Sequence, residues 1–231
     1  MVGNPAEAAG SDPQDGLRTL VYSHGRSLAK EAPNMTIYAA SKGPKYEQIL
    51  SWIGSGKRVL DVGCGAGAFT ARIADANDVV GVESTEENWR LASEHAAVIR
   101  GEFPDVEVQG PFDVVLFGDV LEHMYNPERA LNRARELGDE VIVCVPNFDC
   151  FIAKGQRAVG IRQTETGILD KTHVYYFNRR IAEAMLREHG LEILEFASPK
   201  PRRAPRWYQW LVNLRPEFFG IQLMYCCRVI R

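Results

Sequence analysis

Residues 59–69 read Val-Leu-Asp-Val-Gly-Cys-Gly-Ala-Gly-Ala-Phe. An apolar run ends at Asp61, glycines follow at Gly63, Gly65 and Gly67, and a helix is expected directly after them. A strand, a tight turn and a helix N-terminus in this order let the backbone come close to a nucleotide-like ligand. Glycine suits such a turn because it reaches positive φ freely and carries no Cβ to block the ligand.

A second acidic residue ends the next expected strand. Twenty residues beyond Gly63, the run 78–83 (DVVGVE) finishes at Glu83. An acid at this distance from a glycine-rich turn accepts hydrogen bonds from both hydroxyls of a bound ribose. The two patterns together predict a ligand that contains adenosine.

Two adenosine-type cofactors fit the turn at this point. The spacing Gly63-x-Gly65-x-x-Ala68 satisfies the dinucleotide fingerprint, which tolerates Ala at its third position. Asp61, however, lies two residues before the first glycine, at the carboxyl end of the strand. A carboxylate there repels a pyrophosphate and attracts the ammonium group of a bound amino acid.

Two segments together carry a family resemblance. Asp61-x-Gly63-x-Gly65-x-Gly67 resembles motif I of the class I S-adenosylmethionine-dependent methyltransferases, and residues 112–123 (FDVVLFGDVLEH) resemble their fourth-strand motif. The resemblance runs from about Tyr38 to the C-terminus. It implies S-adenosylmethionine as the cofactor and S-adenosylhomocysteine as its product.

The same resemblance assigns cofactor contacts residue by residue. It implies contacts with the methionine and ribose for Asp61, Gly63, Cys64, Gly65 and Gly67, with the ribose hydroxyls for Glu83, with the adenine for Ser84, Glu102 and Phe103, and with the methionine for Asp119 and Val120. The Cys64 side chain itself is expected to be a small filler rather than a nucleophile.

Three residues are candidates for catalysis. His123 follows the fourth strand and is expected either to take a proton from an acceptor hydroxyl or to line the cofactor pocket. The run 167–177 resembles the Asp-x-Thr-His segment of methyltransferases that act in glycan and small-molecule biosynthesis. In this run, His173 is expected to be a base whose tautomer is fixed by the Asp170 carboxylate. Alternatively, Asp170 and His173 brace the loop, and Thr172 stabilises its local turns.

Composition sets broader limits. The chain has 231 residues, 45% of them hydrophobic and 25% charged, which is typical of one ordinary globular domain. A net charge of −3 gives no general attraction to nucleic acid or to anionic membranes. Neither a membrane-spanning run nor a secretory signal is recognisable, and five cysteines lack metal-ligand spacing. We expect a cytoplasmic protein with reduced thiols and no metal site.

Alternating strands and helices predict an α/β fold with a doubly wound, Rossmann-like sheet. Strands are expected at 58–62, 79–83, 98–99, 112–117, 140–145, 191–196 and 220–229, and helices at 44–52, 69–76, 85–97, 127–137 and 178–189. The resemblance implies that the seventh strand is antiparallel and lies between the fifth and the sixth. Residues 1–16 are expected to be a disordered tail, and 17–231 a single domain.

Two long irregular stretches, 146–177 and 198–219, are expected to cover the substrate. The second contains residues 200–210 (KPRRAPRWYQW), which combine positive charge with aromatic rings. This composition suits an anionic or carrier-linked small molecule, and less well an RNA.

The resulting functional hypothesis is O-methylation of a sugar-like or natural-product acceptor. Three alternatives remain at this stage: an N-methyltransferase acting on a small molecule or RNA, an NAD-dependent oxidoreductase, and a non-catalytic scaffold that retains the cofactor pocket. The sequence predicts neither the identity of the acceptor nor the oligomeric state.

Overall fold

A computed structural model of the chain describes residues 41–201 and 203–231. These residues belong to one compact unit, Ala32–Arg231. The expected tail at 1–16, and residues 17–40 of the expected domain, lie outside the described residues. The domain boundary at residue 17 therefore stays a prediction.

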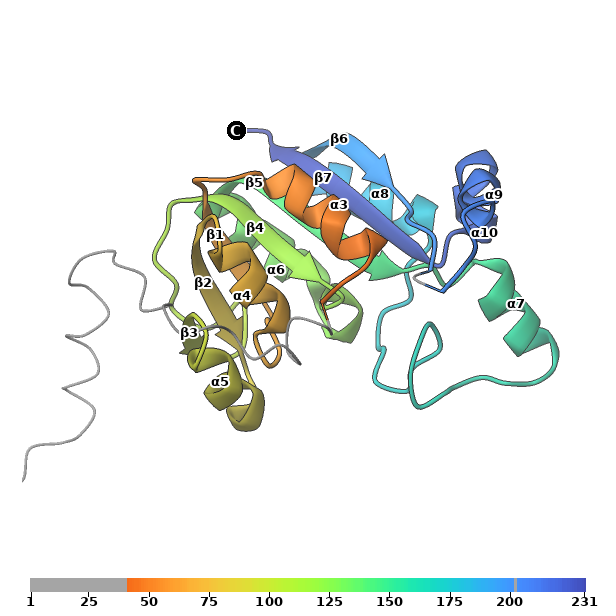
Figure 1. Cartoon of the computed structure of the whole chain (residues 1–231), viewed down its shortest axis with the longest axis horizontal. Coiled ribbons are helices and arrows are strands. Elements are labelled where there is room, and N and C mark those ends of the chain that lie inside the picture. The colour runs from red at the N-terminus through yellow and green to blue at the C-terminus, as the bar shows by residue number, and fades with distance from the viewer. Residues whose placement is uncertain (1–40, 202) are drawn as a thin grey trace, which may run out of the picture. The chain divides into compact units, whose positions relative to one another are not determined.

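The described residues contain a seven-stranded sheet with the order β3-β2-β1-β4-β5-β7-β6 (Figure 1). The first five strands pair in parallel, and β7 pairs antiparallel with both β5 and β6. The strands are β1 (Arg58–Val62), β2 (Asp78–Glu83), β3 (Ala97–Arg100), β4 (Phe112–Gly118), β5 (Gly138–Pro146), β6 (Leu191–Ala197) and β7 (Gln222–Val229). This topology confirms the predicted fold class and the insertion of the last strand between β5 and β6.

Helices cover both faces of the sheet. They are α3 (Pro44–Ile53), α4 (Ala68–Ala74), α5 (Glu86–Ser93), α6 (Pro127–Leu137), α7 (Phe151–Ala158), α8 (Arg179–Glu188), α9 (Tyr208–Leu214) and α10 (Pro216–Phe219). In Figure 1, α3 and α4 lie in front of the sheet, and α6 and α8 lie behind it.

The core follows this layering, because the side chains of each strand alternate between the two faces. On one face, Ile49 and Ile53 of α3 pack with Leu116 and Ile142 of the sheet. On the other face, residues of α6 and α8 pack against β4 and β5, among them Leu131, Ala134 and Leu186. A buried parallel sheet of this kind presents the carboxyl ends of its strands at one edge, where ligands bind in open α/β folds.

Several helix ends show how local sequence fixes the elements. The side-chain oxygen of Asn126 accepts a hydrogen bond from the Arg129 N–H at the start of α6, and Asn178 does the same for Ile181 at the start of α8. Gly190 follows α8 with φ of 67°, as expected of a C′ glycine.

Gly138, which follows α6, does not have the left-handed conformation of a C′ glycine. Its φ is −134°, and it starts β5 directly after α6. The requirement for glycine here is steric, since a Cβ would lie 2.8 Å from Cγ2 of Val115.

Other differences concern helix limits. The helix expected to reach residue 97 ends at Ser93, so His95 lies beyond it, because residues 97–100 join the sheet as β3. The two stretches expected to be irregular contain α7, α9 and α10. They contact each other, since Phe151 packs against Phe218 and Phe219 with ring centroids 5.9 Å apart. Their short helices form against neighbouring segments and carry little periodic signal of their own.

Candidate active site

The three glycines between β1 and α4 all have left-handed backbone conformations. Their φ angles are 67° at Gly63, 56° at Gly65 and 79° at Gly67. The N–H groups of Gly63 and Cys64 donate to the carbonyl of Val82 in β2, at 2.8 and 3.1 Å. The turn is thereby fixed to the end of the neighbouring strand.

Packing closes this turn at both ends and leaves its middle open. A Cβ on Gly63 would lie 2.6 Å from Cγ2 of Val120, and one on Gly67 would lie 2.8 Å from Cα of Ala92. Among the described residues, nothing lies within 4 Å of the Cβ position of Gly65. The Cys64 side chain turns toward the sheet, where its Sγ lies 2.8 Å from the Cβ position of Gly81.

Asp61 lies in β1 between Gly81 of β2 and Leu116 of β4. Asp61 is 5% exposed, and its Oδ2 accepts a hydrogen bond from Thr70 Oγ1 at 2.7 Å. Burial raises the pKa of the Asp61 carboxyl to about 6, although the Thr70 hydroxyl and the Lys45 ammonium oppose the rise. A buried carboxylate with one hydroxyl partner is suited to receive a cationic group.

Glu83, at the end of β2, is 7% exposed and holds the other side of the turn. Its Oε2 accepts from the Gly65 N–H at 2.9 Å, and its Oε1 accepts from the N–H and hydroxyl of Thr85 at 2.9 and 2.8 Å. A carboxylate oxygen has two acceptor positions, so Oε2 can still accept from a further donor, whereas Oε1 already accepts twice. Ser84 follows as an exposed residue.

The residues expected to contact the adenine edge follow β3. Glu102 is exposed. Phe103 is 5% exposed and packs edge-on against Phe117, with ring centroids 5.8 Å apart. Its ring therefore belongs to the core of the sheet. The roles of both residues toward a cofactor stay predictions.

Asp119 directly follows β4 and has a strained backbone conformation, with φ of 61°. Aspartate tolerates the left-handed region better than most residues. Its carboxylate pairs with the Lys45 ammonium and accepts from the Gln222 amide. Burial works against the charge of Lys45, but the attraction and hydrogen bond of Asp119, together with Cys144 and Tyr46, leave the pKa of Lys45 raised. Side chains from α3, β4 and β7 thus meet at the carboxyl end of the sheet.

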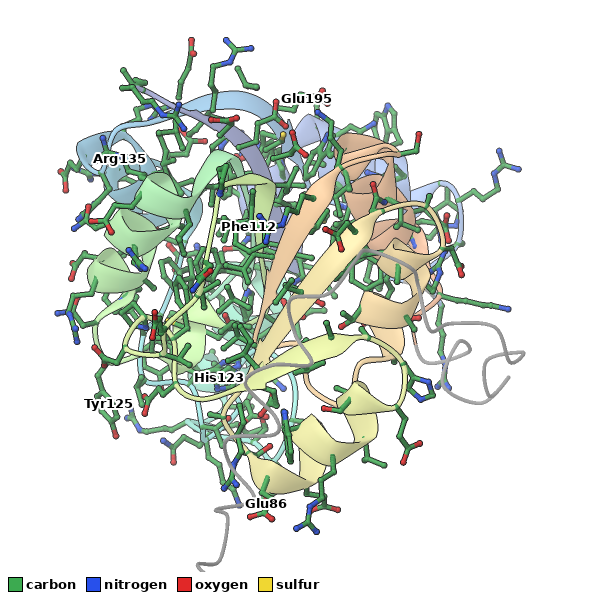
Figure 2. The ribbon with its side chains drawn as sticks, turned by 90° about the vertical axis from the view of Figure 1, so that its left-hand side faces the viewer. Glu86, Phe112, His123, Tyr125, Arg135 and Glu195 are labelled. Carbon is green, nitrogen blue, oxygen red and sulfur yellow. The ribbon has the colours of Figure 1, made fainter. Side chains whose placement is uncertain are left out.

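His123 and His173 also meet at this edge, with ring centroids 4.8 Å apart and ring planes inclined by 67°. His123 ends a short 3₁₀ helix, Leu121–His123, and is exposed. Figure 2 shows it toward the same end of the molecule as Glu86, with Arg135 and Glu195 at the opposite end. His173 is 8% exposed, and burial is the main cause of the lowered pKa of its imidazole.

Backbone carbonyls orient both imidazoles. Nδ1 of His123 lies 3.2 Å from the Thr172 carbonyl oxygen, and Nδ1 of His173 lies 3.1 Å from that of Ile168. The Asp170 carboxylate instead accepts from the N–H and hydroxyl of Thr172, at 2.9 and 2.7 Å, and the pKa of Asp170 is lowered by these bonds. Of the two alternatives for Asp170, these contacts match the one in which it braces the loop, and the Ile168 carbonyl orients His173. The catalytic roles of Asp170 and His173 stay predictions.

Glu122 precedes His123 and is 1% exposed. Its backbone carbonyl accepts from the N–H groups of Val174 and Tyr175, at 2.9 and 3.0 Å, which brings the loop of His173 to the end of β4. Among the described residues its carboxylate oxygens have no hydrogen-bond partner. Glu122, His123 and His173 form a group whose ligand atoms all lie within 4.8 Å of one another.

Sequence reasoning missed four contributors to this edge: Lys45, Thr70, Gln222 and the carboxylate of Glu122. Lys45 and Gln222 lie far from the motifs along the chain and approach Asp119 only through the sheet order. Thr70 carried a usable signal, because a hydroxyl in the first turn of α4 can reach back to the strand before it.

Comparison with known proteins identifies the family. A family model described as a methyltransferase domain matches residues 37–196, which is more than half of the chain. The chain belongs to this methyltransferase domain family. The assignment confirms the resemblance to class I S-adenosylmethionine-dependent methyltransferases, the class whose cofactor is S-adenosylmethionine.

Relatives and solved structures agree with the assignment. The ubiquinone biosynthesis O-methyltransferase of Bordetella avium (strain 197N) is 33% identical over 38% of this chain and 43% of its own length. That of Psychrobacter cryohalolentis is 35% identical over 39% of this chain and 40% of its own. The chain thus matches about two fifths of the length of these relatives.

The fold is shared more widely than the sequence. Magnesium protoporphyrin IX methyltransferase from Synechocystis PCC 6803, crystallised with S-adenosylhomocysteine, superposes with a TM-score of 0.63. The two sequences are 14% identical, and the superposition covers 94% of this chain and 94% of the other.

Within the described residues, no helix is long and apolar enough to cross a membrane. The cytoplasmic location stays a prediction.

Proposed function

We propose that this chain transfers a methyl group from S-adenosylmethionine to an oxygen of a small-molecule acceptor. The observation that carries the proposal is the open middle of the turn at Gly65, between the buried carboxylates of Asp61 and Glu83. Asp61 receives the ammonium of the methionine portion, and Glu83 accepts from the ribose hydroxyls. The turn, including the backbone of Gly63, Cys64 and Gly67, approaches the nucleoside.

The remaining cofactor contacts come from the ends of β2, β3 and β4. Ser84 flanks the adenine, and Glu102 and Phe103 meet its edge. Asp119 and Val120 face the methionine portion, which is supported by the packing of Val120 against Gly63. This arrangement aims the sulfonium methyl toward the end of β4.

Methyl transfer from a sulfonium is an in-line displacement with a neutral leaving group. The enzyme must chiefly align the acceptor oxygen, the methyl carbon and the sulfur. The imidazoles of His123 and His173 stand beside the end of β4 and activate the acceptor hydroxyl, with Asp170 bracing the loop that carries His173. His173 is the stronger candidate because its ring is buried and oriented by the Ile168 carbonyl.

Two observations bear on the acceptor. The relatives named above are O-methyltransferases by name, which supports an oxygen acceptor. Residues 198–216 carry five basic residues and no acidic one, within a chain of net charge −3. They favour an anionic or carrier-linked small molecule, which the segments 146–177 and 198–219 cover when it is bound.

A methyl-transfer assay tests the proposal. Purified protein is incubated with methyl-labelled S-adenosylmethionine and a panel of phenolic, sugar, sugar-phosphate and amine acceptors. We expect label in a base-stable ether, together with S-adenosylhomocysteine in equal amount. Label recovered only in amine acceptors would contradict the proposed oxygen specificity.

A further inference from the structure

We propose that Glu122, His123 and His173 form a binding site for a divalent transition-metal ion. The inference deepens the proposed function and rests on it for the role of the ion, but not for the binding itself. Two imidazole nitrogens and one carboxylate are a donor set that suits zinc, iron, cobalt or manganese. Such a set fills one side of the ion and leaves coordination positions for water or a substrate oxygen.

The distances suit such a site. The ligand atoms of the three residues lie within 4.8 Å of one another. Donors at about 2.0–2.2 Å from a shared ion lie about 3–4 Å apart. Small rotations of exposed His123 are therefore sufficient to bring the three donors onto one ion.

The hydrogen bonds of the two imidazoles prepare them as ligands. A backbone carbonyl can only accept, so the contacts to Thr172 and Ile168 place the ring hydrogen on Nδ1 of each histidine. The lone pair of each neutral ring is then on Nε2. Histidines that bind metals commonly donate their other ring N–H to a carbonyl in this way, which fixes the tautomer and the ring orientation.

The carboxylate of Glu122 supplies an independent observation. It is 1% exposed, and among the described residues both oxygens lack a hydrogen-bond partner. An unpaired buried carboxylate is costly, and its presence in a folded protein calls for a partner. The nearby cation of Lys45 is already paired with Asp119. A metal ion between Glu122 and the two imidazoles satisfies the carboxylate directly.

The position of the site defines its role. An ion bound there coordinates the acceptor hydroxyl oxygen and lowers its pKa, and the hydroxyl proton leaves to water. The oxygen then bonds to the methyl carbon as the methyl–sulfur bond breaks, which leaves neutral S-adenosylhomocysteine. His123 and His173 thus activate the hydroxyl through the ion.

Metal titration of the full chain tests the site. Protein stripped with a chelator is titrated with Co²⁺, whose visible absorption reports imidazole coordination, and with Zn²⁺ in a calorimeter. We expect one ion per chain. Glu122→Gln and His173→Ala should each weaken binding at least tenfold. His189→Ala is the matched control, because Nδ1 of His189 also contacts a carbonyl, that of Met185 at 2.8 Å, and it should bind as the parent does.

His123→Ala is the second variant, since His123 is exposed and its removal should leave the fold intact. Absence of binding by the parent chain, or equal binding by all variants, would overturn the site. Methyl transfer that is unaffected by the chelator would overturn its role. Binding of S-adenosylhomocysteine is measured separately, so a failed metal titration with intact cofactor binding leaves the proposed function standing.

Discussion

Asp61 is the residue on which cofactor choice depends most. It is buried, it has one hydroxyl partner in Thr70, and burial raises the pKa of its carboxyl to about 6. A dinucleotide pyrophosphate beside this carboxylate would be repelled, whereas an ammonium group compensates for the lost hydration. The Lys45 ammonium faces this carboxyl, and the Cys64 thiol, whose pKa burial raises to about 12, lies near it in its neutral form.

The raised pKa predicts how cofactor affinity depends on pH. The folded protein binds a proton at Asp61 below pH 6, whereas the unfolded chain does so only below about 3.8. Ionising Asp61 therefore lowers the stability of the ligand-free protein as pH rises through this window. The ammonium of S-adenosylhomocysteine prefers the ionised form, so its affinity should fall about tenfold from pH 7 to pH 5. Calorimetry across this range checks the prediction, and Asp61→Asn should remove the dependence.

Gly65 offers a second prediction at this scale. Gly65→Ala should cost about 1–2 kcal/mol of stability from its positive φ. It should also lower the affinity for S-adenosylhomocysteine, because the new methyl group enters the open space of the turn. Gly56→Ala is the matched control, since Gly56 has φ of 71° and open space around its Cβ position. We expect both variants to lose similar thermal stability and only Gly65→Ala to lose affinity for S-adenosylhomocysteine. Equal affinity of the two variants for this ligand would contradict the proposed position of the nucleoside.

At the scale of elements, sequence patterns predicted the strands and the long helices well. Strand β1 and helix α6 have the expected limits, because β-branched runs and an Asn-Pro start are strong local signals. Helices α7, α9 and α10 were missed, since each is short and depends on its neighbours. The turn at Gly63 and the acid at Glu83 could be predicted because each belongs to a short motif of neighbouring residues.

The contacts that sequence could not predict are those made between elements. Asp119 was expected at the end of β4, but its partners Lys45 and Gln222 come from α3 and β7. Likewise, the orientation of His173 by Ile168 depends on how the loop folds back on itself. Such contacts are set by strand order and register, which no single segment encodes.

The junction of α6 and β5 gives a prediction for packing. Gly138→Ala should lower stability by about 1–3 kcal/mol, because its Cβ would overlap Val115 and force a shift in a packed core. Gly155→Ala in α7 is the control: nothing described lies within 4 Å of its Cβ position, and alanine favours helix by up to about 1 kcal/mol. Thermal unfolding compares the two, and a Gly138→Ala protein as stable as the parent would contradict the steric reason for this glycine.

At the scale of the whole molecule, the sheet assembles one site from distant parts of the chain. The turn after β1, the end of β2, the end of β4 and the loop before α8 all reach the same edge. The segments after β5 and β6 meet nearby, where the Asn147 side chain donates to the carbonyls of Glu217 and Gly220. We expect acceptor binding to depend on both segments together.

The domain boundary is a prediction at this scale. A chain that begins at Leu17 should keep the thermal midpoint and cofactor affinity of the full chain, because residues 1–16 lack apolar periodicity. A chain that begins at Gly43 should be less stable, since it loses the Ser41 hydroxyl that donates to the Ala68 carbonyl at 3.1 Å. Loss of stability on removal of residues 1–16 alone would place them within the domain.

The central claim is that the turn between Asp61 and Glu83 holds S-adenosylmethionine. Calorimetric titration of the full chain with S-adenosylhomocysteine and, separately, with NADH tests it most directly. The account predicts that S-adenosylhomocysteine binds one to one, that Asp61→Asn and Glu83→Gln each weaken binding about 10- to 100-fold, and that the exposed control Asp78→Asn does not. Binding of NADH without S-adenosylhomocysteine, or full affinity in both site variants, would contradict it.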